Sequence, residues 1–381
     1  MVRNGRKQLR RISIREITFE KVQQWWCGFC RRSFTFRKTV KRQHFSNIFI
    51  KEAVKDFIQG RSSYAVIKER KDISIGTLSG WVNQFGTACM NPVEISGALR
   101  LRTFNKWSGI LILDAKYLNR RCLLLLAIDY TTLDIVAWFV CEAETEENYK
   151  KIIEMVRACG YVIRAVVSDG EPGIIALTQP KKPIWLFKGT RAYPRPGIVP
   201  ALPLLPPLFG IPHQWCTVHA ERKLKHYLVN LSKEERKNIE PLIHKTLFAG
   251  TIKQAEKERE KLLEAVYHHP QIYKTFNTFL VSRWELLTAH FTVRVNKRKI
   301  PRSTNSIENI ISYVNTRLKT MRRLRTNKSA TAIANLIVVN FRSKPLINTK
   351  NKLKRGKSPL ELSTGKKHHF DWMIFIKKSC S

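Results

Sequence analysis

The central part of the chain alternates short apolar runs with turn-forming residues, a pattern typical of β-strands. Three such runs follow one another: Ile110–Asp114, Arg121–Ile128 and Ile135–Val140. The links between them are short and polar, so we expect three consecutive antiparallel strands. A helix with Tyr149, Ile152 and Val156 on one face comes next, and the run Val162–Val167 then predicts a fourth strand.

Two of these expected strands lead into a carboxylate. Asp114 closes the first run, and Asp169 follows the fourth run and precedes Gly170. Three strands, a helix and a fourth strand form the opening of a ribonuclease H-like fold, in which the first and fourth strands lie side by side. The order therefore predicts an α/β core with a mixed sheet that brings Asp114 and Asp169 together.

A third acid, Glu308, lies where a helix is expected to begin, in the segment Ser303–Asn309. Three converging carboxylates can hold two divalent metal ions about 3.5–4 Å apart, which suits in-line phosphoryl transfer. Oxygen ligands favour Mg²⁺ or Mn²⁺. Each acid also has an ordinary explanation, because Asp114 and Asp169 could be turn residues and Glu308 could cap its helix. Taken together, the three acids favour catalysis.

Other carboxylates nearby compete for this role. We interpret Asp129 and Asp134 as turn residues between strands, and Glu171 as a neighbour of the site.

Residues 46–90 predict a small helical domain. Apolar residues recur at helical spacing, and serines precede the expected second helix. Three short helices surrounded by Lys and Arg resemble a helix-turn-helix, a DNA-binding unit. An ordinary three-helix packing unit is the alternative.

The first 45 residues form a basic segment with a Cys-x-x-Cys pair, Cys27 and Cys30. This pair is half of a structural zinc site, since such sites take four ligands. His44 could supply a third ligand, as in part of a zinc ribbon. Two unliganded thiols explain the pair equally well.

The charge of the chain identifies the kind of partner it needs. There are 69 Lys and Arg against 29 Asp and Glu, a formal net charge of +40. Counterion release would hold so basic a protein on a polyanion.

The longest uninterrupted apolar stretch, Cys122–Ile128, is far too short to span a membrane. Eight cysteines do not make a disulfide scaffold, so we expect a cytoplasmic, nucleoid-associated protein.

Several short motifs occur in one order: Leu113-Asp114-Ala115, Leu124 to Asp129, Val167-Ser168-Asp169-Gly170, Trp215-Cys216-Thr217-Val218-His219 and Thr304 to Glu308. This ordered set resembles the DDE transposases of bacterial insertion sequences, and within them the Mutator-like group, over about residues 105–345. The resemblance implies that Asp114, Asp169 and Glu308 bind two Mg²⁺ (or Mn²⁺) ions. It also implies a helical insertion, here at about 178–300, in which Cys216 and His219 support the active site.

The remaining regions add detail to this interpretation. Trp284 resembles an insertion tryptophan placed near DNA, although a core role is the simpler explanation. The proline-rich residues 178–209 depart from the family pattern. Basic residues after Glu308 could hold the DNA backbone: Arg317, Lys319, Arg322 and Arg323. Residues 346–381 are expected to form a basic C-terminal tail.

The sequence thus predicts a transposase that cuts double-stranded DNA at the ends of its own element and joins them to target DNA. Pairing of two ends implies a homo-oligomer, at least a dimer. Two alternatives stay open: an inactivated or domesticated transposase that only binds DNA, and a ribonuclease H-like nuclease.

Overall fold

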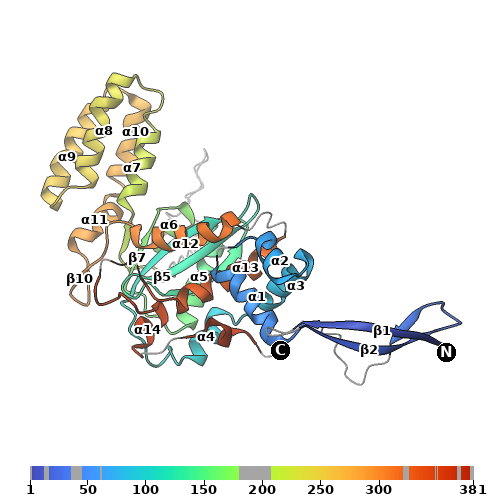
Figure 1. Ribbon diagram of the computed structural model, residues 1–381. Coiled ribbons are helices and arrows are strands. Elements are labelled where there is room, and N and C mark those ends of the chain that lie inside the picture. Colours follow the sequence, from blue (N-terminus) through green and yellow to red (C-terminus); the bar gives the residue numbers. More distant parts are fainter. Residues whose placement is uncertain are drawn as a thin grey trace, which may run out of the picture.

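The computed structural model describes residues 2–12, 17–35, 45–60, 62–179, 207–320, 326–347, 349, 351–366 and 370–377. Figure 1 shows an N-terminal β-hairpin that extends from an α/β body, and a group of helices that projects from another side of that body. His44, Arg322, Arg323 and most of the proline-rich segment lie outside the described residues.

The body is built on a five-stranded mixed sheet with the strand order β6-β5-β4-β7-β8. Its strands are β4 (Ile110–Tyr117), β5 (Leu123–Asp129), β6 (Ile135–Cys141), β7 (Ala165–Ser168) and β8 (His213–Trp215). β4, β5 and β6 pair antiparallel, as expected, while β7 lies parallel to β4, and β8 lies parallel to β7. The mixed α/β character predicted from the sequence is confirmed.

Helices cover both faces of this sheet (Figure 1). Leu111 and Leu113 face the side that holds α5 (Glu146–Ala158) and α6 (Pro172–Thr178). Ile110 and Ile112 face the side that holds α12 (Asn305–Thr320) and α13 (Asn327–Ser343). Because alternate strand residues point to opposite faces, a sheet covered on both sides needs continuous apolar strands. This accounts for the seven buried residues in a row in β5.

Four helices precede the sheet: α1 (Asn47–Gln59), α2 (Tyr64–Lys71), α3 (Ile75–Thr87) and α4 (Pro92–Ala98). The first three begin after Ser46, Ser63 and Ser74, whose side chains accept hydrogen bonds from backbone N–H groups of the first turn. The buried residues of α1–α3 belong to the same hydrophobic cluster as Ile112 of the sheet and Ile337 of α13. The three helices are therefore docked on the body through a shared core.

The N-terminal segment forms an antiparallel sheet of β1 (Val2–Ile12), β2 (Ile17–Trp26) and β3 (Ser33–Thr35). The sequence analysis predicted no strands here. Cys27 and Cys30 lie in the tight turn between β2 and β3, which is closed by a hydrogen bond from the Cys27 N–H to the Arg32 carbonyl (3.0 Å).

The helical insertion consists of α7 (Thr217–His226), α8 (Lys233–Leu247), α9 (Ile252–Ala265), α10 (Pro270–Leu280) and α11 (Trp284–Thr292). Its apolar residues form a cluster of their own, with Trp215 at its base. The helical character expected for this region is present, and α8 begins with a capping box between Ser232 and Glu235. The short strands β9 (Arg294–Val295) and β10 (Arg298–Lys299) then lead to α12.

Part of the expected C-terminal tail is folded against the body. It contains α14 (Pro359–Thr364) and a 3₁₀ helix (Trp372–Phe375), and Leu360, Trp372 and Phe375 are buried in the main hydrophobic cluster. None of the described helices is long and apolar enough to cross a membrane.

The close packing of α3 on α13 gives a direct test of how the N-terminal helices α1–α3 pack on the body. A Cβ added at Gly86 would lie 2.2 Å from the carbonyl oxygen of Ala332, whereas one added at Gly80 would meet nothing within 4 Å. We expect Gly86→Ala to lower the free energy of unfolding by roughly 1–3 kcal/mol through overpacking. Gly80→Ala, on the same helix, should raise it by about 0.5–1 kcal/mol. Urea denaturation of both variants checks this, and equal effects would contradict the docked arrangement.

Candidate functional site

Two carboxylates lie side by side where two parallel strands end. β4 and β7 pair so that Ile112 lies opposite Val167. Asp114 and Asp169 each come two residues later and therefore reach the same level of the sheet. Asp114 is only 7% exposed and Asp169 is half-buried. The proximity of these two acids, expected from the sequence, is present in the structure.

The backbone around Asp169 is fixed by close packing. The indole Nε1–H of Trp215 donates a hydrogen bond to the Asp169 carbonyl. Gly170 has a φ of 81°, and a Cβ at this position would lie 1.9 Å from the Trp215 ring. Only glycine fits here, because the conformation and the close approach both exclude a side chain. Gly170 therefore allows the chain to turn while Trp215 holds Asp169 in place.

Burial and a neighbouring negative charge raise the pKa of both carboxyl groups. Burial, with the neighbouring charge of Asp169, raises the pKa of Asp114 to about 7, against an ordinary value of 3.8. Burial and then the charge of Glu171 raise the pKa of Asp169. Like charges held together in a poorly solvated site behave in this way. A divalent cation between them would relieve both effects, so the pair fits a metal ion of the Mg²⁺ or Mn²⁺ type.

Two further acids lie close enough to affect this pair. Burial raises the pKa of Glu144, and the charges of Asp169 and Glu171 raise it further. The Tyr149 hydroxyl donates a hydrogen bond to Glu144 (2.7 Å) and so holds that side chain. The sequence analysis placed Glu171 beside the site but missed Glu144. The only signal in the sequence was that Glu144 follows β6 closely. The path of the loop after β6, which brings Glu144 toward the site, cannot be read from the sequence.

Cys216 and His219 lie between the carboxylates and α12. The Cys216 N–H bonds to the carbonyl of Ser168 (2.7 Å), and the Cys216 sulfur accepts hydrogen bonds from the N–H and hydroxyl of Thr304 (3.3 and 3.4 Å). Burial raises the pKa of the Cys216 thiol, but hydrogen bonds from His219 and Thr304 outweigh it and lower the pKa overall. The interaction with Cys216 raises the pKa of His219, and the charges of Asp169 and Asp114 add to this. These interactions favour the protonated form of the His219 imidazole.

Glu308 lies on α12, the helix that begins next to the contact between Thr304 and Cys216. Thr304 precedes α12 and touches Cys216, and Glu308 is four residues further on, which places it on the same side of the helix. Its side chain is exposed. Ile110 and Ile112 precede Asp114 at alternate positions of β4 and so point to the same face of the sheet as Asp114. α12 packs on that face. Among the described residues, no group of three or more His, Cys, Asp or Glu side chains already converges as metal ligands.

Arg317, which was expected to bind DNA, lies in the interior of the structure. Arg317 is only 1% exposed, and its guanidinium donates a hydrogen bond to the Phe57 carbonyl of α1. It therefore joins α12 to the N-terminal helices, and burial removes it from contact with a DNA backbone. The prediction failed because the sequence shows a basic residue on this helix but not that α1 packs over it. Lys319 is exposed, as that role requires, and Arg322 and Arg323 lie outside the described residues.

The rival carboxylates hold structure together. Asp129 accepts hydrogen bonds from Ser108, Thr131, Thr132 and Tyr161 and so fixes the β5–β6 turn. Asp134 is fully buried in a two-point pair with Arg342 (2.7 and 3.1 Å).

His213, Trp284 and the two N-terminal cysteines have partners within the structure. Burial lowers the pKa of His213 to about 4, and its two ring nitrogens contact Ser168 (2.8 Å) and Thr178 (3.1 Å). Trp284 packs against the helical insertion under the guanidinium of Arg259 (4.5 Å). Cys30 is exposed and interacts with Cys27, and hydrogen bonds from this turn lower the pKa of the Cys27 thiol. Zinc binding at these two thiols stays a prediction, since a structural zinc site takes four ligands.

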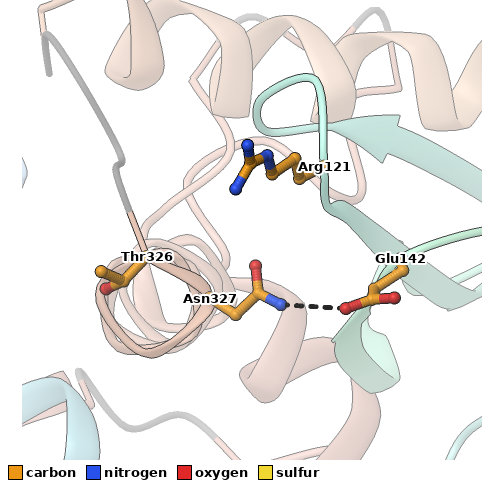
Figure 2. Close-up of a pocket in the computed structure, with 4 residues that line it drawn as sticks. All are labelled: Arg121, Glu142, Thr326 and Asn327. Carbon is orange, nitrogen blue, oxygen red and sulfur yellow. Dashed lines mark hydrogen bonds between the residues drawn. The ribbon is translucent and has the colours of Figure 1, made fainter.

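A small surface pocket of about 510 Å³ is lined by Arg121, Glu142, Thr326 and Asn327. Figure 2 shows these side chains around an open space, with the Asn327 amide bonded to Glu142 (3.4 Å). None of the residues predicted for the site lines it.

The raised pKa of Asp114 predicts how stability changes with pH. In the folded state the carboxyl holds its proton up to about pH 7, whereas its ordinary pKa is 3.8. Wild-type stability should therefore fall as the pH rises from about 4 to about 7. Without divalent ions, Asp114→Asn removes this loss and should be more stable at pH 8, by up to about 4 kcal/mol.

Thermal melting at pH 4 and pH 8 in EDTA measures the effect, with the exposed Glu285→Gln as the control for loss of one negative charge. A difference between wild type and Asp114→Asn that does not change with pH would contradict the prediction.

A comparison with models of protein families matches residues 207–344 to the Mutator family of transposases. The matched segment runs from just before β8 through the helical insertion, α12 with Glu308, and α13; it begins after Asp114 and Asp169. The resemblance inferred from the sequence is thus confirmed over this segment. No curated protein is significantly similar to the chain.

Proposed function

We propose that this chain, whose residues 207–344 match the Mutator family of transposases, cuts DNA strands and transfers them at the ends of its own mobile element. The family match supports a transposase role in general. The observation that supports the chemistry is the in-register parallel pairing of β4 and β7, which sets Asp114 beside Asp169.

The strand arrangement is the one expected for a ribonuclease H-like core. Three antiparallel strands are followed by two parallel ones, in the order β6-β5-β4-β7-β8. In our proposal Asp114 and Asp169 hold the metal ions from this rigid sheet. Glu308 approaches from α12, and its exposed side chain is able to turn toward them. Bound Mg²⁺ or Mn²⁺ would neutralise charge on the attacking and leaving oxygens of the phosphodiester.

The chain's own residues would orient the reaction. Trp215 and Gly170 keep Asp169 at a fixed position, and His219 adds positive charge on the side of Cys216. The exposed Lys319 lies on the same helix as Glu308 and would hold the DNA backbone through its phosphates. The substrate in this proposal is double-stranded DNA, and two paired ends would require at least a dimer. Cys27 and Cys30 would take a zinc ion only with further ligands.

Strand cleavage with matched variants tests this proposal. The purified protein is incubated with Mg²⁺ or Mn²⁺ and DNA that carries the ends of its genomic neighbourhood. We expect nicked and joined products, and a loss of at least about 100-fold in Asp169→Asn and Glu308→Gln, because each removes a charged ligand.

Glu285→Gln is the control for Glu308→Gln, since both are exposed glutamates in the first turn of a helix. It should cleave at the wild-type rate. Tight end binding without cleavage in wild type would instead identify an inactivated transposase that only binds DNA, and preferential cleavage of an RNA–DNA hybrid would identify a ribonuclease H-like nuclease.

A further inference from the structure

Glu144 leaves the sheet at the same edge as the two carboxylates of the candidate site. β4 and β6 both pair antiparallel with β5 and so run in the same direction, and β7 is parallel to β4. Asp114 lies in the second half of β4, and Asp169 directly follows β7. Glu144 comes three residues after Cys141, the last residue of β6. The topology therefore brings a third carboxylate to this edge of the sheet.

The loop that carries Glu144 packs against the residues that follow Asp169. α6 begins at Pro172, only three residues after Asp169. A Cβ added at Gly173 would lie 2.9 Å from the Glu144 carbonyl oxygen and 2.9 Å from the Tyr149 ring. Such a close approach of the two segments requires glycine. Packing thus places Glu144 next to the segment that carries Asp169.

A buried tyrosine holds the Glu144 side chain. Tyr149 of α5 is fully buried, and its hydroxyl donates a hydrogen bond to the Glu144 carboxylate (2.7 Å). Thr145 caps α5 by accepting a hydrogen bond from the Asn148 N–H (3.3 Å), and the Asn148 side chain donates one to the Ala143 carbonyl (2.9 Å). The backbone on both sides of Glu144 is therefore fixed, and its carboxylate has a set position.

The acids at this edge act on one another through their charges. Burial, and then the charges of Asp169 and Glu171, raise the pKa of Glu144, whereas the hydrogen bond from Tyr149 lowers it. Glu144 is also one of the charges that raise the pKa of Asp114, after burial and Asp169. A divalent cation at Asp114 and Asp169 would be attracted by Glu144 as well as by its two direct ligands.

Glu144 is placed to act on such a cation without binding it directly. Among the described residues, no three His, Cys, Asp or Glu side chains converge as metal ligands. A carboxylate just outside a ligand set acts through its charge and through a bridging water, and such residues strengthen metal binding.

We propose that Glu144, held by Tyr149, is a positioning residue that strengthens the binding of a divalent cation at Asp114 and Asp169. This role rests on the metal site of the proposed function, but it does not depend on strand cleavage.

Titration of the full chain with Mn²⁺, without DNA, tests this role, with free Mn²⁺ measured by electron paramagnetic resonance. Glu144→Gln removes the charge but keeps an oxygen that can accept the hydrogen bond from Tyr149. We expect this variant to bind Mn²⁺ about tenfold more weakly or worse. Tyr149→Phe keeps the charge but releases the carboxylate, and should weaken Mn²⁺ binding by about threefold or more.

The matched control is Glu147→Gln, which removes the same charge from an exposed glutamate in the first turn of α5. It should bind Mn²⁺ within about twofold of wild type. Asp169→Asn removes a proposed direct ligand and should weaken Mn²⁺ binding more than Glu144→Gln does. Circular dichroism in EDTA confirms that each variant is folded.

The outcomes separate this role from the metal site itself. If Asp169→Asn weakens Mn²⁺ binding and Glu144→Gln does not, Glu144 only accepts the hydrogen bond from Tyr149, and the positioning role is wrong while the metal site stands. Equal losses in Glu144→Gln and Glu147→Gln would reveal a general effect of charge and would also overturn the role. If Mn²⁺ binding is unchanged in Asp169→Asn, the metal site of the proposed function is wrong as well.

Discussion

The structure around the candidate site depends on one constraint, the parallel pairing of β4 with β7. This pairing brings two carboxylates to one level of a buried sheet, although burial and a neighbouring negative charge disfavour the ionised form of each. Neighbouring strands on both sides hold the two carboxylates in position. β5 and β6 extend the sheet beyond β4, and β8, which carries Trp215, extends it beyond β7. Ionising such a pair lowers the stability of the fold, and a cation between the two carboxylates would offset that loss.

Helix α12 connects the parts of the molecule. One side begins at the Thr304–Cys216 contact and carries Glu308, and another packs on the sheet. Buried Arg317 ties the same helix to α1. The N-terminal helices also share their core with α13, so these helices, α12 and α13 form one packed unit.

The local periodicity and the order of the elements were sufficient to predict much of this arrangement. Strands β4 to β6, the amphipathic helix α5 and the proximity of Asp114 to Asp169 follow from apolar patterning and topology. The burial of Arg317 did not, because periodicity shows only that a basic residue lies on a helix and not what packs above it. Glu144 was missed for a similar reason: its place beside Asp169 depends on loop geometry. The strands β1 to β3 were missed because frequent charged residues conceal their alternation.

The most direct test of the account is to locate a divalent ion. In a crystal of the protein soaked with Mn²⁺, anomalous scattering should show density between the Asp114 and Asp169 carboxylates, with the Glu308 side chain turned toward it. Manganese bound elsewhere, with Asp114 and Asp169 sharing a proton and Glu308 still directed into solvent at saturating Mn²⁺, would contradict the assignment of these three residues as the metal site.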